Sequence, residues 1–382
     1  MATQKRSSWF GLIIAVLAIA VAVYFFLDGR RLRQEIEDLN TGQVAEATLG
    51  QDEEPAPIEE EDDAEAVVGA LETVLARGKL ILGGHGSLPG FGVLDAASGE
   101  FTGFDVDFGH AVAAALGVEI EVIPLTAGER FTALQTGQVD LLIRNTTWTL
   151  TRDSSDVAAD FGPTTFYDGQ GFIVRRADGI ASIDDLDGAT VCVTSGTTTE
   201  GNLADAFRER GLTLTTQVFS ETEAAFSAYD SAACDCYTSD KSQLASLRTT
   251  ATNPGDHMIL PDTISKEPLG PLTRHGDNEW ADIVSWVVFA TFFAEEHGIT
   301  QANVASFESD NPTVRRFLGH EGGLGAKLGL DEDWAVRVIS AVGNYGEIYE
   351  RHLGPQGLDI PREGSLNAQW KDGGLIYAPA WR

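Results

Sequence analysis

The chain has 382 residues, of which 43% are apolar and 9% aromatic. This length is more than one typical domain needs, and the apolar content excludes a wholly disordered chain, because a sizeable core can be buried. Acidic residues outnumber basic ones 58 to 26, for a net charge of −32, which argues against a nucleic-acid-binding protein because such proteins need clustered lysine and arginine. The three cysteines are too few for a disulfide scaffold or a four-cysteine zinc site.

An uncharged apolar run occupies residues 10–27 (FGLIIAVLAIAVAVYFFL), with basic residues on both sides of it. Its 18 residues just span a bilayer as a helix, and they exceed the about 7–15 residues of a signal-peptide core. We therefore expect residues 1–28 to form a membrane anchor or signal segment, and favour an uncleaved anchor, the transmembrane helix running from Phe10 to Leu27. The basic flanks leave its orientation undecided.

Residues 51–66 (QDEEPAPIEEEDDAEA) contain nine acids and two prolines. Such a segment buries too little surface to fold and is extended by self-repulsion, so residues 29–77 are expected to form an acidic flexible tether. The following residues, 67–382, still hold 44 acidic and 21 basic side chains. Two interpretations of this charge stay open, an ordinary acidic protein and adaptation to a saline habitat.

From residue 78 onward, short apolar runs alternate with amphipathic segments. The first set predicts strands at 80–82, 119–123 and 139–143 and helices at 105–116 and 130–135. A second set, after an apolar run at 172–174, predicts strands at 190–193, 217–219 and 234–237 and helices at 199–210 and 221–229. Helical patterns at 279–297 and 331–349 dominate the end. The alternation indicates an α/β fold with mainly parallel sheets, and two such units suggest a ligand held between two lobes.

The segment 139–153 (VDLLIRNTTWTLTRD) places dense hydrogen-bonding groups and two arginines directly after a predicted strand. The planar guanidinium of Arg152, beside hydroxyl and backbone N–H groups, is suited to bidentate capture of a small carboxylate. The alternative is a threonine-rich turn in which Arg152 pairs with Asp153 or Asp156.

Two further segments follow predicted strands of the second set. In 191–202 (VCVTSGTTTEGN), Thr197 and Glu200 have the spacing of a capping box, and the helix that they open offers N–H groups to an anion. In 233–241 (ACDCYTSDK), Asp240 lies at a strand end and is suited to an ammonium group. The alternatives are a plain capped helix and an N-cap aspartate.

The chain resembles the periplasmic general L-amino-acid-binding proteins of ABC importers, solute-binding protein family 3. Seven segments carry the resemblance in colinear order: 103–107 (GFDVD), 144–152 (RNTTWTLTR), 167–172 (YDGQGF), 196–200 (GTTTE), 264–271 (ISKEPLGP), 342–347 (VGNYGE) and 373–379 (GGLIYAP). It implies a type II periplasmic-binding-protein fold, α/β, with two lobes joined by two hinge strands. Residues 78–168 would form the first part of lobe 1, and residues 169–264 would form lobe 2. Residues 265–382 would return to lobe 1 and add a C-terminal helical extension.

The resemblance also implies ligand-binding roles, position by position. Arg152 is similar to the arginine that binds the α-carboxylate of the ligand, and Asp240 to the carboxylate that receives its α-ammonium. Polar neighbours are implied at Asn145, Thr147 and, from the other lobe, Thr198. The side-chain pocket would be lined by Phe91 and by Arg130, which would favour acidic or polar side chains.

A disulfide is implied between Cys192 and Cys234, whereas Gly83 or Gly84 and Gly109 stand where relatives have a second pair of cysteines. The implied function is extracytoplasmic capture of L-amino acids and delivery to the permease of an ABC importer. We expect no cofactor, no metal and no nucleic-acid partner, and a periplasmic location tethered to the inner membrane. Two alternatives remain: a dehydratase-like enzyme on the same fold, and a tethered amino-acid sensor.

Overall fold

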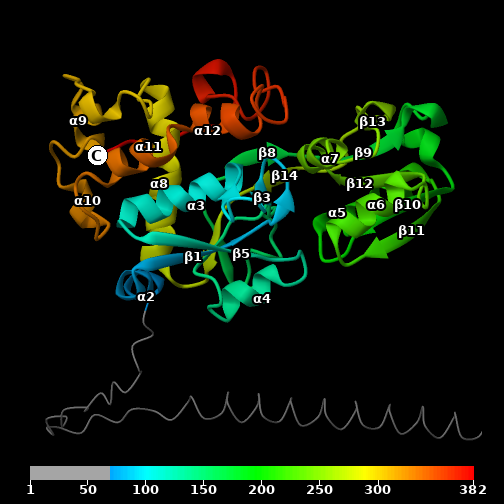
Figure 1. Ribbon diagram of the computed structural model, residues 1–382, viewed down its shortest axis with the longest axis horizontal. Coiled ribbons are helices and arrows are strands. Elements are labelled where there is room, and N and C mark those ends of the chain that lie inside the picture. Colours follow the sequence, from blue (N-terminus) through cyan, green and yellow to red (C-terminus); the bar gives the residue numbers. More distant parts are fainter. Residues whose placement is uncertain (1–68) are drawn as a thin grey trace, which may run out of the picture. The chain divides into compact units, whose positions relative to one another are not determined.

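The computed structural model describes residues 69–382, so the predicted anchor at 10–27 and most of the acidic tether lie outside the described residues. The expectation of a flexible tether up to residue 77 is wrong at its end, because Ala70–Arg77 form a helix that buries Ala70, Leu71 and Val74. Two five-stranded sheets form the centres of two lobes (Figure 1). The sheet of lobe 1 has the order β5-β1-β6-β15-β7, with bounds β1 Lys79–Gly84, β5 Glu119–Pro124, β6 Leu141–Leu142, β7 Ala159–Phe161 and β15 Leu272–Arg274. The expected two-lobed α/β architecture is confirmed.

The sheet of lobe 2, drawn in green in Figure 1, has the order β11-β10-β12-β9-β13. Its strands are β9 Gln170–Arg175, β10 Ala189–Thr194, β11 Leu214–Phe219, β12 Cys236–Asp240 and β13 His257–Ile259. In lobe 1, β1 pairs in parallel with β5 and β6, and in lobe 2, β10 pairs in parallel with β11 and β12. Each sheet also contains one antiparallel strand that enters after the chain crosses between lobes, β15 in lobe 1 and β9 in lobe 2. The predicted strand at 234–237 begins two residues later, so Cys234 precedes it.

A two-stranded sheet links the lobes, with β8 (Phe166–Asp168) antiparallel to β14 (Glu267–Leu269). Its register pairs Glu267 with Asp168. A small hairpin sheet of lobe 1 comprises β2 Ser87–Leu88, β3 Gly92–Leu94 and β4 Phe101–Thr102. Because the chain passes between the lobes twice, rotation about these two segments can open and close the space between the sheets.

Helices cover both sheets, with α2 Ala70–Arg77, α3 Phe104–Leu116 and α4 Arg130–Gln135 in lobe 1 and α5 Thr198–Arg210, α6 Thr222–Asp230 and α7 Lys241–Arg248 in lobe 2. Helix α3 lies close against β1, because a Cβ on Gly109 would come within 2.4 Å of the Leu82 side chain. A larger side chain at position 109 would require the Leu82 side chain to shift.

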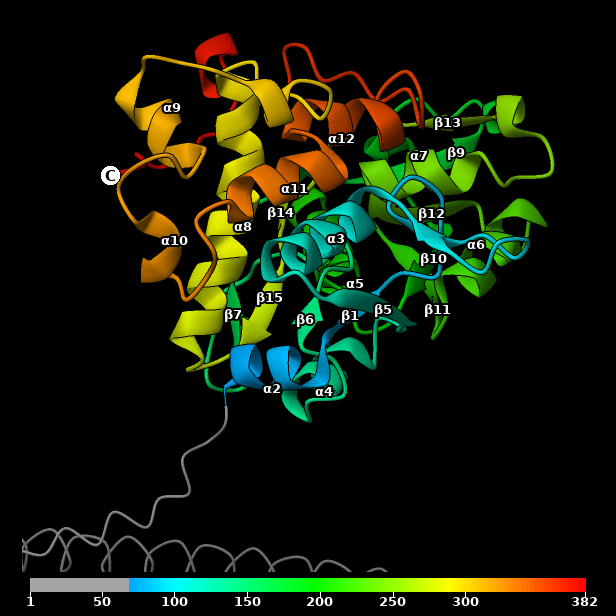
Figure 2. The same ribbon diagram turned by 60° about the vertical axis from the view of Figure 1, so that its left-hand side comes forward.

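The C-terminal part packs on lobe 1 through α8 Asn278–Glu296, α9 Pro312–Phe317, α10 Leu324–Lys327, α11 Trp334–Val342 and α12 Tyr345–His352. Helix α11 lies along α3 in both Figure 1 and Figure 2. The single helix predicted over 331–349 is wrong, because Gly343 takes a positive φ of 81° and Asn344 starts a new helix with a capping box to Glu347. None of the described helices has the length and apolar character needed to cross a bilayer.

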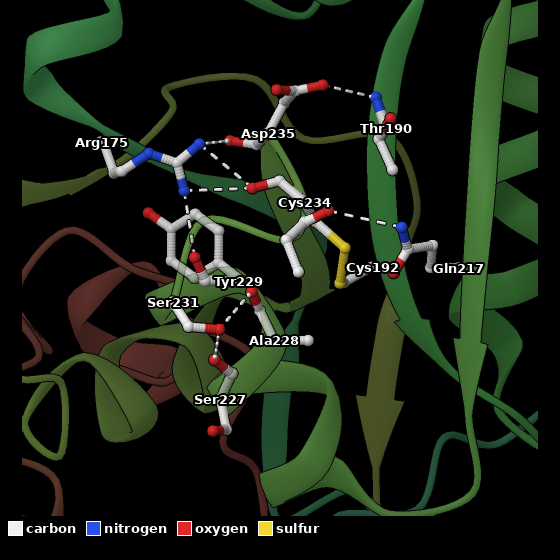
Figure 3. Close-up of a disulfide and its surroundings, with 11 residues drawn as sticks. Arg175, Thr190, Cys192, Gln217, Ser227, Ala228, Tyr229, Ser231, Cys234 and Asp235 are labelled. Carbon is white, nitrogen blue, oxygen red and sulfur yellow. Dashed lines mark hydrogen bonds between the residues drawn. A yellow bond between two sulfur atoms is a disulfide. The ribbon is translucent and has the colours of Figure 1, made fainter.

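Lobe 2 carries one disulfide, between Cys192 of β10 and Cys234, while Cys236 is buried and free. The expected pairing is confirmed. Figure 3 shows the Arg175 guanidinium beside this bond, donating to the carbonyl oxygens of Cys234 (3.1 Å) and Asp235 (3.2 Å). The segment that carries Cys234 is therefore fastened to β9 as well as to β10.

Candidate functional site

A polar pocket lies between the two lobes. Six of the predicted ligand-binding residues line it, namely Arg130, Asn145, Thr147, Arg152, Thr198 and Asp240. The structure thus brings together side chains that are up to 110 positions apart, between Arg130 and Asp240. The remaining lining residues are Ala127, Arg144, Thr197, Thr199, Thr222, Ser239 and Gln243.

Phe91 is not brought to this pocket. Its side chain is fully buried in the hydrophobic core of lobe 1, where its ring packs edge-on against Phe104 and Phe166 at centroid distances of 6.1 and 5.9 Å. The expectation that Phe91 lines the side-chain pocket therefore does not hold. The turn at Gly90, with a φ of 82°, sends the following residue inward, and no spacing rule in the sequence gives that direction.

Lobe 1 supplies three guanidinium groups to the pocket, from Arg130, Arg144 and Arg152, each at most 7% exposed. Burial lowers the pKa of the Arg130 guanidinium well below its usual range, and repulsion from Arg152 and Arg144 adds to the effect. Burial likewise lowers the pKa of Arg144 to about 10. The aromatic ring of Phe131 lies 4.9 Å from the Arg130 guanidinium carbon and 5.3 Å from that of Arg152, a contact that fixes both groups.

The Arg152 guanidinium does not form the local pair that the alternative interpretation required. Its Nη1 donates to the Thr147 carbonyl at 2.9 Å, while the Asp153 carboxylate accepts from the indole of Trp148 at 2.9 Å. The first bond ties Arg152 to its own loop and orients the guanidinium at the pocket. A buried cation that is held this way and lacks a local partner favours an anionic ligand.

Lobe 2 and the linking strands supply the opposite charge. Burial raises the pKa of the Asp240 carboxyl well above its usual range, and the nearby Asp168 and Glu267 raise it further, while Arg152 and Arg130 act the other way. Asp240 is the N-cap residue of α7, but its side chain makes no capping hydrogen bond. The carboxyl group therefore serves the pocket and not the helix.

The predicted capping box at Thr197 and Glu200 is wrong as well. Helix α5 has no side-chain cap, and the Thr197 hydroxyl donates to the Thr194 carbonyl at 2.6 Å. The Thr198 hydroxyl donates to Glu267 of β14 at 2.9 Å. Thr198 thus joins lobe 2 to a linking strand, and its helix-start position leaves the backbone N–H for a ligand.

Polar contacts across the pocket hold the lobes together. Asn145 donates from Nδ2 to the Gln243 amide oxygen at 2.9 Å, and Arg130 donates to the Gly196 carbonyl at 3.4 Å. Farther out, the Ser246 hydroxyl donates to the Pro89 carbonyl at 2.7 Å. The structure is thus a closed form, with both charged walls facing one enclosed volume.

The backbone of Asn145 is held in an unusual conformation by a residue outside the pocket. Its φ of 30° is positive, and its N–H donates to the Asp105 carboxylate at 2.6 Å. Asp105 is 3% exposed, at the start of α3. Neither Asp105 nor Gln243 can be recognised as a site residue from the sequence, because each reaches the loop from another element and no local pattern indicates the contact.

Within residues 69–382, no group of three or more histidine, cysteine or acidic side chains is placed to hold a metal ion. The pocket is lined by charged and hydrogen-bonding groups and lies between two lobes that the chain joins by two crossings. This is the architecture of a protein that encloses a small polar ligand by closing one lobe on the other.

Comparison with known proteins identifies the family. Residues 80–311 match the model of the bacterial extracellular solute-binding proteins, family 3, and the chain belongs to this family. It is 49% identical to the glutamate/glutamine/aspartate/asparagine-binding protein BztA of Rhodobacter capsulatus, over 83% of this chain and 94% of that protein. It is 50% identical to the general L-amino acid-binding periplasmic protein AapJ of Rhizobium johnstonii, over 82% and 92%.

Among solved structures, an ABC transporter periplasmic binding protein from Brucella ovis with glutathione bound is 49% identical, with a TM-score of 0.80. The match covers 82% of this chain and all of that one. Together with the family match, it shows a type II periplasmic-binding-protein-like α/β fold with two lobes. The chain is thus a solute-binding protein of the kind that serves ABC transporters.

Proposed function

We propose that this protein captures L-amino acids in the pocket between its lobes, outside the cytoplasm, and delivers them to an ABC importer. The observation that carries the proposal is the separation of charge across one enclosed volume, with guanidinium groups on lobe 1 and the Asp240 carboxyl on lobe 2. A zwitterion matches this arrangement. The names of the two relatives with about half of their residues identical support the amino-acid class.

In this proposal Arg152 binds the α-carboxylate and Asp240 the α-ammonium. Asn145, Thr147 and Thr198 complete the hydrogen bonds. Because the two charges come from different lobes, only the closed form engages both, and the ligand shifts the open–closed equilibrium by its differential affinity. No step in this account makes or breaks a covalent bond in the ligand.

Arg130 is the residue that would face the ligand side chain. Its Nε has no hydrogen-bond partner among the described residues, and the side chain is 3% exposed. An unpaired buried cation is costly, so a ligand with a second carboxylate gains most from it. We therefore expect L-glutamate and L-aspartate to bind more tightly than neutral amino acids.

Calorimetry on the full-length chain tests both roles. Arg152→Ala should weaken binding about tenfold or more for every amino acid, since charge-assisted hydrogen bonds contribute about 1.5–3 kcal/mol each. Arg130→Ala should instead change the ranking, with a larger loss for acidic than for neutral ligands. Arg176→Ala, an exposed arginine of lobe 2, is the matched control. An Arg152→Ala affinity within about threefold of the parent would contradict the assignment.

We further propose that Phe10–Leu27 stays attached as a transmembrane helix and that the acidic segment after it tethers the binding lobes to the inner membrane. The support is the uncharged 18-residue run and the acid-rich composition of 51–66. Intact-mass analysis of protein from its native membrane is the test. A mature N-terminus between residues 20 and 66 would show a cleaved signal and a freely diffusing protein.

A further inference from the structure

One short segment of lobe 1 contacts lobe 2 outside the ligand pocket. It comprises β2 and the proline that follows, residues 87–89, and we call it the clasp. None of its residues is among those that line the pocket. Two helices of lobe 2 meet the clasp, α6 through Glu223 and α7 through Ser246.

The first contact joins the clasp to the start of α6. The Ser87 hydroxyl donates to the carboxylate of Glu223, which lies in the first turn of that helix. Glu223 also lies near a buried cation of lobe 1: burial lowers the pKa of Arg144, and among the nearby acids Glu223 opposes this effect most. One carboxylate of lobe 2 thus meets a hydroxyl and a guanidinium of lobe 1, and opening of the lobes would part it from both.

The second contact joins the clasp to α7. The hydroxyl of Ser246, a fully buried residue, donates to the Pro89 carbonyl at 2.7 Å. Opening of the lobes would take this acceptor away, and a hydroxyl without a partner costs free energy until water replaces the lost bond. The second contact therefore favours the closed form, as the first does.

Lobe 1 holds the clasp firmly. Leu88, its middle residue, is fully buried in the hydrophobic core, and β2 pairs with β3. The Phe91 N–H donates to the Leu88 carbonyl at 3.1 Å and closes the turn that follows the clasp. The clasp therefore moves with lobe 1, and its two hydrogen bonds to lobe 2 form only when the lobes are close together.

We infer that the clasp sets the affinity of this protein for all of its ligands alike, by stabilising the closed form without touching the ligand. The inference rests on the proposed function, because it needs an amino acid enclosed between the lobes. The free energy that the clasp contributes on closing adds to that of the ligand contacts, whatever the ligand side chain. Glu223 and Ser246 therefore determine affinity and the lifetime of the complex, whereas residues inside the pocket determine which ligand is preferred.

Calorimetry on the full-length chain with L-glutamate and L-glutamine tests the inference. Glu223→Ala and Ser246→Ala should each weaken the binding of both ligands about three- to tenfold, and by the same factor for the two ligands. Glu209→Ala and Ser227→Ala, at exposed positions on α5 and α6, are the matched controls. They should leave both affinities within about twofold of the parent.

Kinetics and a double-mutant cycle separate the clasp from a general loss of stability. Because the ligand escapes only after the lobes open, stopped-flow tryptophan fluorescence should show the loss of affinity as faster dissociation, with little change in association. Ser87→Ala combined with Glu223→Ala should weaken binding no further than Glu223→Ala alone, since the second change removes a hydrogen bond that is already lost.

The possible outcomes distinguish the inference from the proposed function. If Glu223→Ala and Ser246→Ala bind both ligands as the parent does, or if the two ligands lose affinity by unequal factors, the inference is overturned and the proposed function stands. If the parent itself binds neither amino acid, the proposed function fails, and the inference fails with it.

Discussion

At the scale of single residues, Asp240 makes ligand binding sensitive to pH. Burial raises the pKa of its carboxyl well above the usual range in the ligand-free protein, and a bound ammonium would lower it again. Binding should therefore release a proton. The affinity for L-glutamate should rise with pH from about 4 upward, and it should level off at the pH where Asp240 is already ionised in the ligand-free protein. Calorimetry in two buffers of different ionisation enthalpy measures the protons released.

Glutarate is the control ligand, because it has the two carboxylates of glutamate and no ammonium. With no positive group to favour ionised Asp240, its binding should improve as the pH falls. The role of Asp240 would be contradicted if the protein took up a proton on binding glutamate, or if both ligands showed the same pH dependence of affinity.

Asp105 supports the pocket from outside it, through its hydrogen bond with Asn145 and its charge interaction with Arg144. Burial raises the pKa of its carboxyl to about 7, against the hydrogen bond from Asn145 and the charge of Arg144, which lower it. The folded state thus holds this proton more tightly than the unfolded chain. Its contribution to the free energy of unfolding is present below pH 4 and is lost as the pH rises through 7, by ~4 kcal/mol.

Asp105→Asn should remove this part of the pH dependence and keep an acceptor for the Asn145 N–H. Asp105→Ala removes the acceptor as well, and we expect it to weaken all amino acids about tenfold, since a buried N–H is left unpaired. Urea denaturation between pH 4 and 8 and calorimetry at neutral pH separate the two effects. A parent-like affinity for Asp105→Ala would show that Asn145 needs no such support.

At the scale of elements, the disulfide links β10 to the approach of β12 across a sequence separation of 42. Replacing both Cys192 and Cys234 by alanine should lower the free energy of unfolding by ~3–4 kcal/mol in the chain-entropy model. Because the side chains of Arg175 and Asp235 still hold the segment by hydrogen bonds to the backbone of Cys234 and Thr190, ligand affinity should stay within about threefold. Denaturation and calorimetry measure the two quantities.

Cys236→Ala is the control for this experiment, because it removes a buried thiol and leaves the disulfide intact. It should lower the free energy of unfolding by only ~1 kcal/mol, because the lost sulfur leaves a small cavity. Equal losses in the control and in the double variant would mean that packing around sulfur, and not the cross-link, carries the effect.

The sequence predicts whole elements better than it predicts the direction of single side chains. The apolar period gives α4 its observed bounds, 130–135, and places α3 and α8 within one residue at each end. The apolar period does not reveal that one helix ends and another begins at Gly343, because the period continues across the turn between them. Phe91 shows the other limit, since an aromatic residue in a loop can point into the core or the site with the same neighbours in sequence.

The pocket was predictable where its residues follow strands, because the carboxyl ends of strands face the space between lobes. Asn145 and Asp240 are of this kind. Gln243 was not predictable, since its place in the pocket depends on how close lobe 2 comes to lobe 1. Family resemblance supplied the ligand roles, which residue patterns alone left open between a turn, a cap and a binding site.

At the scale of the whole molecule, the excess of acidic side chains is expected to make stability depend on salt. Residues 67–382 carry 44 acidic and 21 basic side chains, and this self-repulsion opposes the compact state at low ionic strength. We expect the melting temperature to rise by about 5 °C or more between 0.05 and 1 M NaCl, as salt screens the repulsion. Differential scanning calorimetry measures the change.

A charge-reversed variant tests whether repulsion is the cause. Glu209, Glu308 and Glu363 are exposed acids, and changing all three to lysine should reduce the salt dependence and stabilise the protein in dilute buffer. An unchanged salt dependence would instead point to a general effect of salt on apolar burial.

The position of β15 has a consequence for the order in which the chain folds. This strand lies between β6 and β7 in the sheet of lobe 1, yet it follows all of lobe 2 in the sequence. A chain that emerges from its N-terminus can complete lobe 2 while lobe 1 still lacks a central strand. The sheet of lobe 1 then stays incomplete while about a hundred further residues are synthesised or exported. Until β15 arrives, β6 and β7 present unpaired edges, and this interval is when the nascent protein most needs protection from aggregation.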